Sequence, residues 1–220
     1  MCRGCGEFVS RSSAGGVGSK AGSSLGFMAR PPRHDVPGAF HHVTTRGNRR
    51  QLIYLDAADR GRFLSLLADT VKRYEWKCHS FCLMNNHYHL VLETPKAGLA
   101  PGMQRLNGRY AQTFNRRHGH GGHLFQGRYA AEPIEREPHL LEACRYVVLN
   151  PVRAAACATP EDWVWSSFRP TIGLSRSLTF LTTDWLLAQF ADRRDEAQDR
   201  YRSFVLDGIS SPDVLTAFGV

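Results

Sequence analysis

The sequence has no hydrophobic run that approaches the roughly 20 residues a membrane-spanning helix needs. Its six cysteines do not form a disulfide pattern. Cys78, Cys82 and Cys144 lie within apolar stretches, which is typical of small core residues in a reducing cytoplasm. Cys2 and Cys5 have the spacing of a metal site, but no second pair of this kind follows. These absences argue against an integral membrane protein and a disulfide-stabilised secreted domain, and favour a cytoplasmic location.

The first 27 residues lack core-forming side chains and are rich in Gly and Ser. A segment with so little apolar surface to bury cannot offset the entropy lost on ordering, so we expect it to be disordered. It also has no continuous apolar region of the kind that marks a secretory signal. Because Met28-Ala-Arg-Pro-Pro has the look of a natural start, we interpret residues 1–27 as a disordered leader from a mis-called start.

Acidic residues are missing from residues 103–129, in a chain with 28 Lys and Arg against 20 Asp and Glu. Arginines and aromatic rings alternate there, and together they can hold the phosphates and bases of a single strand. The segment therefore predicts contact with nucleic acid. The alternative is a solvated basic helix face whose aromatic rings belong to the core, where we expect Phe114.

The alternation of apolar and polar residues predicts an α+β fold. The first and third strands would be central in a ferredoxin-like (split βαβ) antiparallel sheet with helices on one face. The expected strands are 39–45, 77–84, 87–94 and 125–134, and the expected helices are 56–74, 99–118, 139–150 and 184–206.

Aromatic residues after the third predicted helix, Trp163, Trp165 and Phe168, are expected to pack the tail back onto the domain. Asp184 is expected to cap the last helix. We therefore divide the chain into the leader, a main domain over residues 28–173 and a C-terminal helical extension over residues 174–220.

Two histidines open an otherwise buried strand in MNNHYHLVLE, residues 84–93. Alternate residues of a strand share a face, so His87 and His89 are predicted on one side and Leu90 and Leu92 on the core side. Two neutral imidazoles at this separation can bind one metal ion. The pattern also fits two hydrogen-bonded histidines on a half-exposed strand.

The helix predicted at 139–150 has one polar stripe, formed by Glu142, Tyr146, Asn150 and Arg153. The proline after Asn150 is expected to bend or end the helix. A tyrosine and an amide one turn apart beside a histidine pair suit a nucleophile and a third metal ligand. The residues expected to face the core are Leu140, Cys144, Val147 and Val148.

Several segments, in this order, resemble the HUH-type single-tyrosine transposases of the IS200-like family, and above all their REP-associated branch. They read HYHLVLE, FNRRHGHGGHLFQGRY, ACRYVVLNPVRA and WVWSSF. The opening MARPPRHDVPGAFHHVTTRGNRRQLIY is similar to the start of that branch. The resemblance covers residues 28–173, with a fainter likeness in the tail.

The resemblance implies that Tyr146 is the nucleophile and that His87, His89 and Asn150 bind Mg²⁺ or Mn²⁺. It implies a metal-dependent transposase and single-strand endonuclease that cleaves and rejoins hairpin-flanked DNA through a 5′-phosphotyrosine. The substrates would be REP-like or insertion-sequence ends, and the enzyme a monomer or homodimer associated with the nucleoid. The expected DNA contacts, from the resemblance and from the basic segment, are Arg46, Asn48, Arg105, Arg109, Arg116, Arg117 and Arg128.

Three alternatives remain open at the level of sequence. Tyr110, in the basic helix, is a rival nucleophile. A non-catalytic, decayed nucleic-acid-binding protein could use the same ferredoxin-like sheet, although such modules place aromatic residues on the central strands. A metal hydrolase with a water nucleophile would need extra carboxylates near the histidines, for which Glu93 and Glu142 are the candidates.

Overall fold

A four-stranded antiparallel sheet with the strand order β2-β3-β1-β4 is the centre of the structure, a computed structural model that describes residues 36–135 and 137–210. The first and third strands are central, as predicted. The leader predicted over residues 1–27 lies outside the described residues. The strands are β1 (Ala39–Arg46), β2 (Lys77–Leu83), β3 (His87–Thr94) and β4 (Ala130–Ile134).

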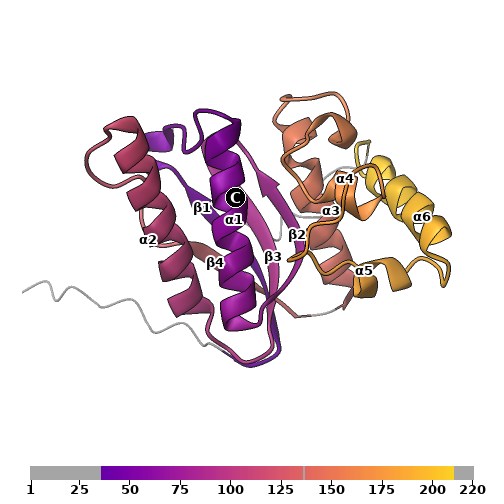
Figure 1. The fold of residues 1–220 in the computed structure, drawn as a ribbon. Coiled ribbons are helices and arrows are strands. Elements are labelled where there is room, and N and C mark those ends of the chain that lie inside the picture. The colour runs from indigo at the N-terminus through magenta and orange to yellow at the C-terminus, as the bar shows by residue number, and fades with distance from the viewer. Residues whose placement is uncertain (1–35, 136, 211–220) are drawn as a thin grey trace, which may run out of the picture. The chain divides into compact units, whose positions relative to one another are not determined.

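Two long helices, α1 and α2, lie side by side over one face of the sheet (Figure 1). α3 packs against the other face, and the shorter helices of the C-terminal segment join the apolar cluster around α3. The fold is the α+β, antiparallel arrangement predicted from the sequence, but its helices cover both faces of the sheet and not one. The helices are α1 (Ala57–Tyr74), α2 (Leu99–His118), α3 (Glu137–Arg153), α4 (Phe168–Thr171), α5 (Asp184–Ala188) and α6 (Arg194–Asp207), with 3-10 turns at Asn48–Arg50 and Pro160–Asp162.

Local sequence explains where the first elements begin and end. The side chain of Asp56 accepts a hydrogen bond from the backbone amide of Asp59 and caps α1. Asn85 and Asn86 form the turn between β2 and β3, where the amide of Met84 donates to the carbonyl of His87 at 2.9 Å. An aspartate before a helix and an Asn-Asn pair between two strands are common local signals for these features. Within the described residues, none of the helices has the length and hydropathy needed to cross a bilayer.

The strand predicted over residues 125–134 is wrong in its first half, because β4 starts only at Ala130. The segment before it crosses the end of β1 and does not pair along the sheet. There the amide of Asn48 donates to the carbonyl of Leu124 at 2.8 Å, and the amide of Gln126 donates to the carbonyl of Arg46 at 3.0 Å. These bonds hold the chain across the strand end until β4 can begin.

Two predicted helix boundaries also need correction. α3 continues through Pro151 to Arg153, although the proline lacks an amide donor, and the amides of Ala154 and Ala156 donate to the carbonyls of Asn150 and Pro151. The single helix predicted over residues 184–206 is two helices, α5 and α6. The chain turns between them and brings Phe190 against Tyr201 and Phe204, with ring centroids 5.5 and 5.4 Å apart.

Candidate active site

The two histidines of β3 share one face of a central strand, which confirms the predicted placement. Their ring centroids lie 5.0 Å apart with the rings near perpendicular. In the antiparallel register Thr44 pairs with His89 and Arg46 pairs with His87, so these β1 residues lie on the histidine face. A metal–imidazole bond is about 2.1 Å long, so one ion can bridge two rings at this separation.

Tyr88, between the histidines, fixes the direction in which they point. Its side chain is fully buried in the core under α1 and α2, with its ring 4.7 Å from that of Phe63. Its hydroxyl donates to Oδ1 of Asn107 on α2 at 2.5 Å. Because neighbouring strand residues point in opposite directions, this anchor turns His87 and His89 to the other face.

A chain of hydrogen bonds defines the tautomer of His87. Nδ2 of Asn86 donates to the carbonyl of Arg50 at 3.0 Å, which leaves Oδ1 of Asn86 facing Nδ1 of His87 at 2.7 Å. An amide oxygen only accepts, so Nδ1 of His87 carries the proton and Nε2 carries the lone pair. His87 is therefore prepared to bind a cation through Nε2.

His89 is more deeply buried and contacts a third histidine. Its Nδ1 lies 3.0 Å from Nε2 of His42 on β1, and the two rings are nearly parallel. Nε2 of His89 is buried and has no hydrogen-bond partner. Burial lowers the pKa of His42 and of His87 to about 4, and it also lowers the pKa of His89 well below its usual value. The three rings are therefore neutral near pH 7, the form in which imidazole binds metals.

α3 brings Tyr146 to the histidines within the same chain. The Tyr146 ring lies edge-on to His42 and His89, with centroid distances of 5.7 and 5.9 Å. The guanidinium carbon of Arg153, two turns further along, lies 5.0 Å from the centre of the Tyr146 ring. Leu140, Cys144, Val147 and Val148 are buried on the other side of α3, as predicted.

The predicted third ligand, Asn150, bonds within its own helix, where its Nδ2 donates to the carbonyl of Tyr146 at 2.9 Å. Across residues 36–135 and 137–210, no three or more His, Cys, Asp or Glu side chains are grouped so that they could hold a metal ion. A complete metal site would therefore need an amide, water or DNA oxygen beside the histidine pair.

The predicted DNA contacts fall into two groups. Arg46 is the cross-strand neighbour of His87 and lies at the site itself. Asn48 follows in the turn after β1, and Arg128 is exposed just before β4. By contrast, Arg105, Arg109 and Arg116 belong to α2, which covers the opposite face of the sheet.

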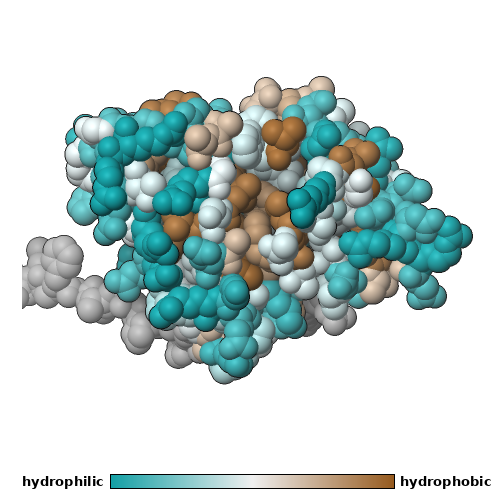
Figure 2. Space-filling view, in the orientation of Figure 1, coloured by the Kyte–Doolittle hydropathy of each residue, from teal (hydrophilic) through white to brown (hydrophobic). Residues whose placement is uncertain are grey.

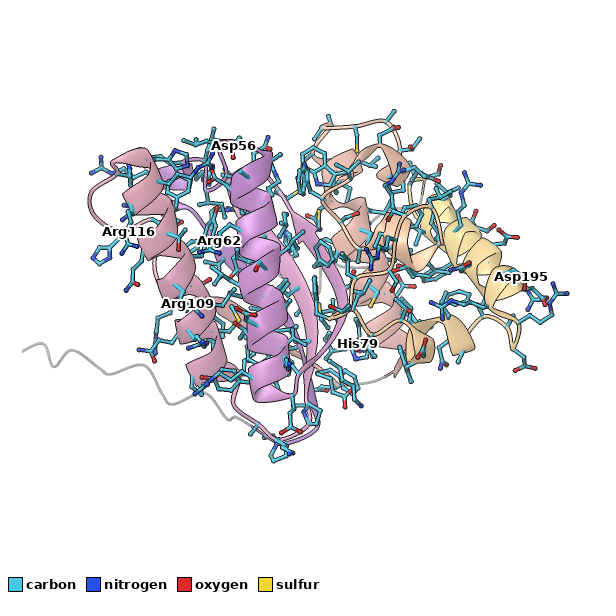
Figure 3. All side chains as sticks on the ribbon, viewed as in Figure 1. Asp56, Arg62, His79, Arg109, Arg116 and Asp195 are labelled. Carbon is cyan, nitrogen blue, oxygen red and sulfur yellow. The ribbon has the colours of Figure 1, made fainter. Side chains whose placement is uncertain are left out.

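Hydrophilic side chains cover the α2 side of the face shown in Figure 2. Arg109 and Arg116 lie along this helix (Figure 3) and are exposed, while Arg105 is half-buried. Arg117 differs from them, because its guanidinium donates to Asp56 and to the buried Asp59. Arg117 is thus held at the start of α1.

The sequence-level alternatives have other partners in the structure. Tyr110 is buried and its hydroxyl donates to the carbonyl of Ile53 at 2.5 Å, so it is a core residue. The Glu93 carboxylate accepts from Lys77 at 2.9 Å, and Glu142 accepts from Arg145. Each carboxylate is thus paired with a cation on its own or a neighbouring element.

Sequence reasoning missed three residues that the structure brings to the site. They are His42, Asn86 and Glu132. The parity of β1 would have placed His42 on the side of Arg46, but only the register with β3 shows that this side faces His89. Arg153 is not among the missed residues, because the polar stripe predicted with Tyr146 already included it.

A family model described as "Transposase IS200 like" matches residues 37–150, which is more than half of the chain. No curated protein matches this chain. Among solved structures, a REP-associated tyrosine transposase bound to a REP hairpin is similar at a TM-score of 0.56 and 17% identity, over 72% of this chain and 91% of that one.

Two further structures are similar at lower scores. A protein of Deinococcus radiodurans R1, provisionally described as a transposase, has a TM-score of 0.39 and 18% identity over 61% of this chain and 98% of its own. A tRNA(His) guanylyltransferase from Saccharomyces cerevisiae has a TM-score of 0.40 and 8% identity over 77% and 79%. Neither score is high enough to carry an argument. The fold thus resembles that of the REP-associated protein, and the matched family model shows that this chain belongs to the IS200-like transposases.

Proposed function

We propose that the chain is a metal-dependent transposase and endonuclease of single-stranded DNA that works through a covalent 5′-phosphotyrosine on Tyr146. The observation that carries the proposal is the position of the Tyr146 ring, edge-on to His89 within one chain. REP-like or insertion-sequence hairpins are the proposed substrates, by analogy with the REP hairpin bound in the similar structure.

The residues at the site fit a divalent cation. His89 presents a buried Nε2 that lacks a partner, and His87 presents the same atom because its Nδ1 donates to Asn86. The bond from Asn150 uses its amide nitrogen and leaves its oxygen for a cation. These three side chains would hold Mg²⁺ or Mn²⁺, with imidazole favouring Mn²⁺, and the bound cation would neutralise charge on the phosphate.

The proposed covalent step is a transfer between two oxygens. The Tyr146 hydroxyl gives its proton to solvent, its oxygen bonds to phosphorus, and the bond from phosphorus to the 3′ oxygen breaks. That oxygen leaves as a 3′-hydroxyl after taking a proton from water. The guanidinium of Arg153, beside the ring, would stabilise negative charge on the phenol oxygen. Attack by another 3′-hydroxyl on the phosphotyrosine rejoins the strand and restores the tyrosine.

A 3′-labelled hairpin oligonucleotide tests this proposal, since the label stays with the covalent product. We expect a labelled protein band on a denaturing gel with Mn²⁺ or Mg²⁺ and none with a chelator. Tyr146→Phe removes one hydroxyl and should abolish the band. Tyr110→Phe is the matched control, because it changes a buried tyrosine of the opposite face and should retain the band.

Other outcomes would identify the alternatives. An adduct that survives in Tyr146→Phe and disappears in Tyr110→Phe would place the nucleophile on α2. Cleaved products without any adduct would support a hydrolase with a water nucleophile. Binding without cleavage, in both metals and with several hairpins, would support a decayed nucleic-acid-binding protein.

A further inference from the structure

His42 contacts the proposed metal site but has no assigned role in the chemistry. It lies on β1, 2% exposed, and its Nε2 is 3.0 Å from Nδ1 of His89. The Tyr146 ring borders both histidines. A hydrogen bond between two neutral imidazoles has two possible directions, and the direction decides what His89 can do.

In the first direction Nε2 of His42 donates to Nδ1 of His89. The single proton of neutral His89 would then sit on Nε2, and that atom could not bind a cation. A buried Nε2–H would also lack an acceptor, since Nε2 of His89 has no hydrogen-bond partner. This direction leaves a buried donor unsatisfied.

In the second direction Nδ1 of His89 donates to Nε2 of His42. His89 then presents a lone pair on Nε2, the same arrangement that Asn86 imposes on His87. The proton of His42 sits on Nδ1, which lies 3.9 Å from Oε2 of Glu132, the residue paired with His42 on β4. This separation is too long for a hydrogen bond, but a carboxylate there favours a proton on the nearer nitrogen.

We infer that His42 is a positioning residue, which accepts the hydrogen bond from Nδ1 of His89 and so fixes His89 as an Nε2 ligand. Glu132 assists by favouring the proton of His42 on Nδ1. The inference rests on the proposed function for its purpose, but the direction of the hydrogen bond can be measured without metal or DNA.

The direct test is the tautomer of His89 in the intact metal-free protein near pH 7.5. Long-range ¹H–¹⁵N correlation spectra of ring nitrogens distinguish a proton on Nδ1 from one on Nε2, and His89→Gln assigns the signal. We expect the proton of His89 on Nδ1. A proton on Nε2 of His89 in the wild-type protein overturns the inference.

Two substitutions of His42 then separate positioning from packing. His42→Phe keeps a ring of similar size and removes the acceptor, so the His89 proton should redistribute to Nε2. Loss of such a supporting partner typically lowers metal affinity by about 10- to 100-fold, and we expect a loss in this range for Mn²⁺ measured by calorimetry. His42→Gln offers an amide oxygen at a similar reach and should restore affinity to within about threefold of wild type.

His41→Phe is the matched control. His41 is the neighbouring buried histidine of β1, points to the opposite face and lies beside Thr94. It should change neither the tautomer of His89 nor the affinity for Mn²⁺. If His42→Phe fails to fold, Glu132→Gln on the edge strand provides a milder variant, in which part of the His89 proton should move to Nε2.

Failure of the proposed function would look different. If wild type, His87→Ala and His89→Ala bind Mn²⁺ equally, the histidine pair is not the metal site, whatever the His89 tautomer. Unchanged tautomer and affinity in a folded His42→Phe would instead overturn the role of His42 alone. The same holds if His42→Gln behaves like His42→Phe, because an acceptor would then not be what matters.

Discussion

The two faces of the sheet differ in the side chains that they carry. The face under α1 and α2 is filled by apolar and aromatic side chains, such as Phe63, Tyr88 and Leu90. The face under α3 carries the histidines of the site, together with His79 near the start of β2. The first face has the composition of a folding core, and the second combines an apolar cluster with the buried histidines of the proposed site. Because both faces share the same strands, the rigidity of the first is passed directly to the second.

The C-terminal segment completes the second face. Leu186 and Leu187 of α5, and Tyr201 and Val205 of α6, join the apolar cluster that surrounds Cys144 on α3. The helix that bears Tyr146 therefore has apolar support on the side away from the histidines. Within the described residues, this support comes from the C-terminal extension, although the extension is a separate segment in the sequence.

The largest effect should follow from removing a histidine of the reaction face. His89→Ala deletes a proposed ligand, and loss of several kcal/mol of charge stabilisation lowers the cleavage rate by about 10³-fold or more. Affinity for a hairpin should stay within about threefold, since we expect the arginines to make the phosphate contacts. Rate and affinity can be measured by gel assay and fluorescence anisotropy. Equal losses of binding and cleavage would contradict the separation of roles.

Substitution of Tyr88, on the same strand as His89, should instead lower the stability of the fold. Tyr88→Ala leaves a large cavity in the folding core, which should cost about 3–5 kcal/mol of unfolding free energy. Tyr88→Phe keeps the ring and loses the hydroxyl, with its hydrogen bond to Asn107 and its contact with Thr45, which should cost about 1 kcal/mol. Urea titrations measure both. A folded Tyr88→Phe that no longer cleaves would show that the hydroxyl anchor is needed to orient His87 and His89.

Two adjacent arginines of α2 distinguish a residue that we expect to contact DNA from one that stabilises the fold. Arg116→Gln should weaken hairpin binding and reduce the slope of log affinity against log salt by about 1, because one phosphate contact is lost. Arg117→Gln should leave that slope unchanged and lower the melting temperature, since it breaks the bonds to Asp56 and Asp59. Salt titrations of both variants are the measurement. A reduced slope in Arg117→Gln would show that Arg117 leaves the carboxylates to bind DNA.

Sequence reasoning succeeded where the local pattern is determined by one strand or helix. The period of two in β3 placed His87 and His89 together, and the apolar spacing of α3 placed Val147 in the core. It failed where partners come from distant segments. The role of His42 depends on its register with β3, and the fate of Arg117 depends on α1. Hydrogen bonds across 47 and 61 positions leave no periodic mark in a sequence.

The smallest expected effect is the loss of stability in acid. The histidine face and the carboxylates near α1 should contribute to this loss in different pH ranges. Burial lowers the pKa of His42 to about 4, and it lowers the pKa of His79 as well, despite the nearby Glu93. The unfolded chain binds protons at these histidines near pH 6.5, while the folded chain does not. The unfolded state therefore gains protons first, and the unfolding free energy falls as the pH drops from about 6.5 to about 4.

Protonation of the carboxylates near α1 lowers the unfolding free energy only in a lower pH range. Arg117 holds the pKa of Asp56 below its usual value near 3.9, so protonation there matters only below that pH. Since 1 kcal/mol shifts the melting temperature of such a domain by about 2–4 °C, we expect a decline of several degrees between pH 7 and pH 4.5. His79→Phe keeps an aromatic ring against Trp185 and should flatten part of this decline. A melting temperature that stays constant to pH 4.5 in the wild-type protein would mean that the histidine face is open to protons and water, contrary to its burial beneath α3.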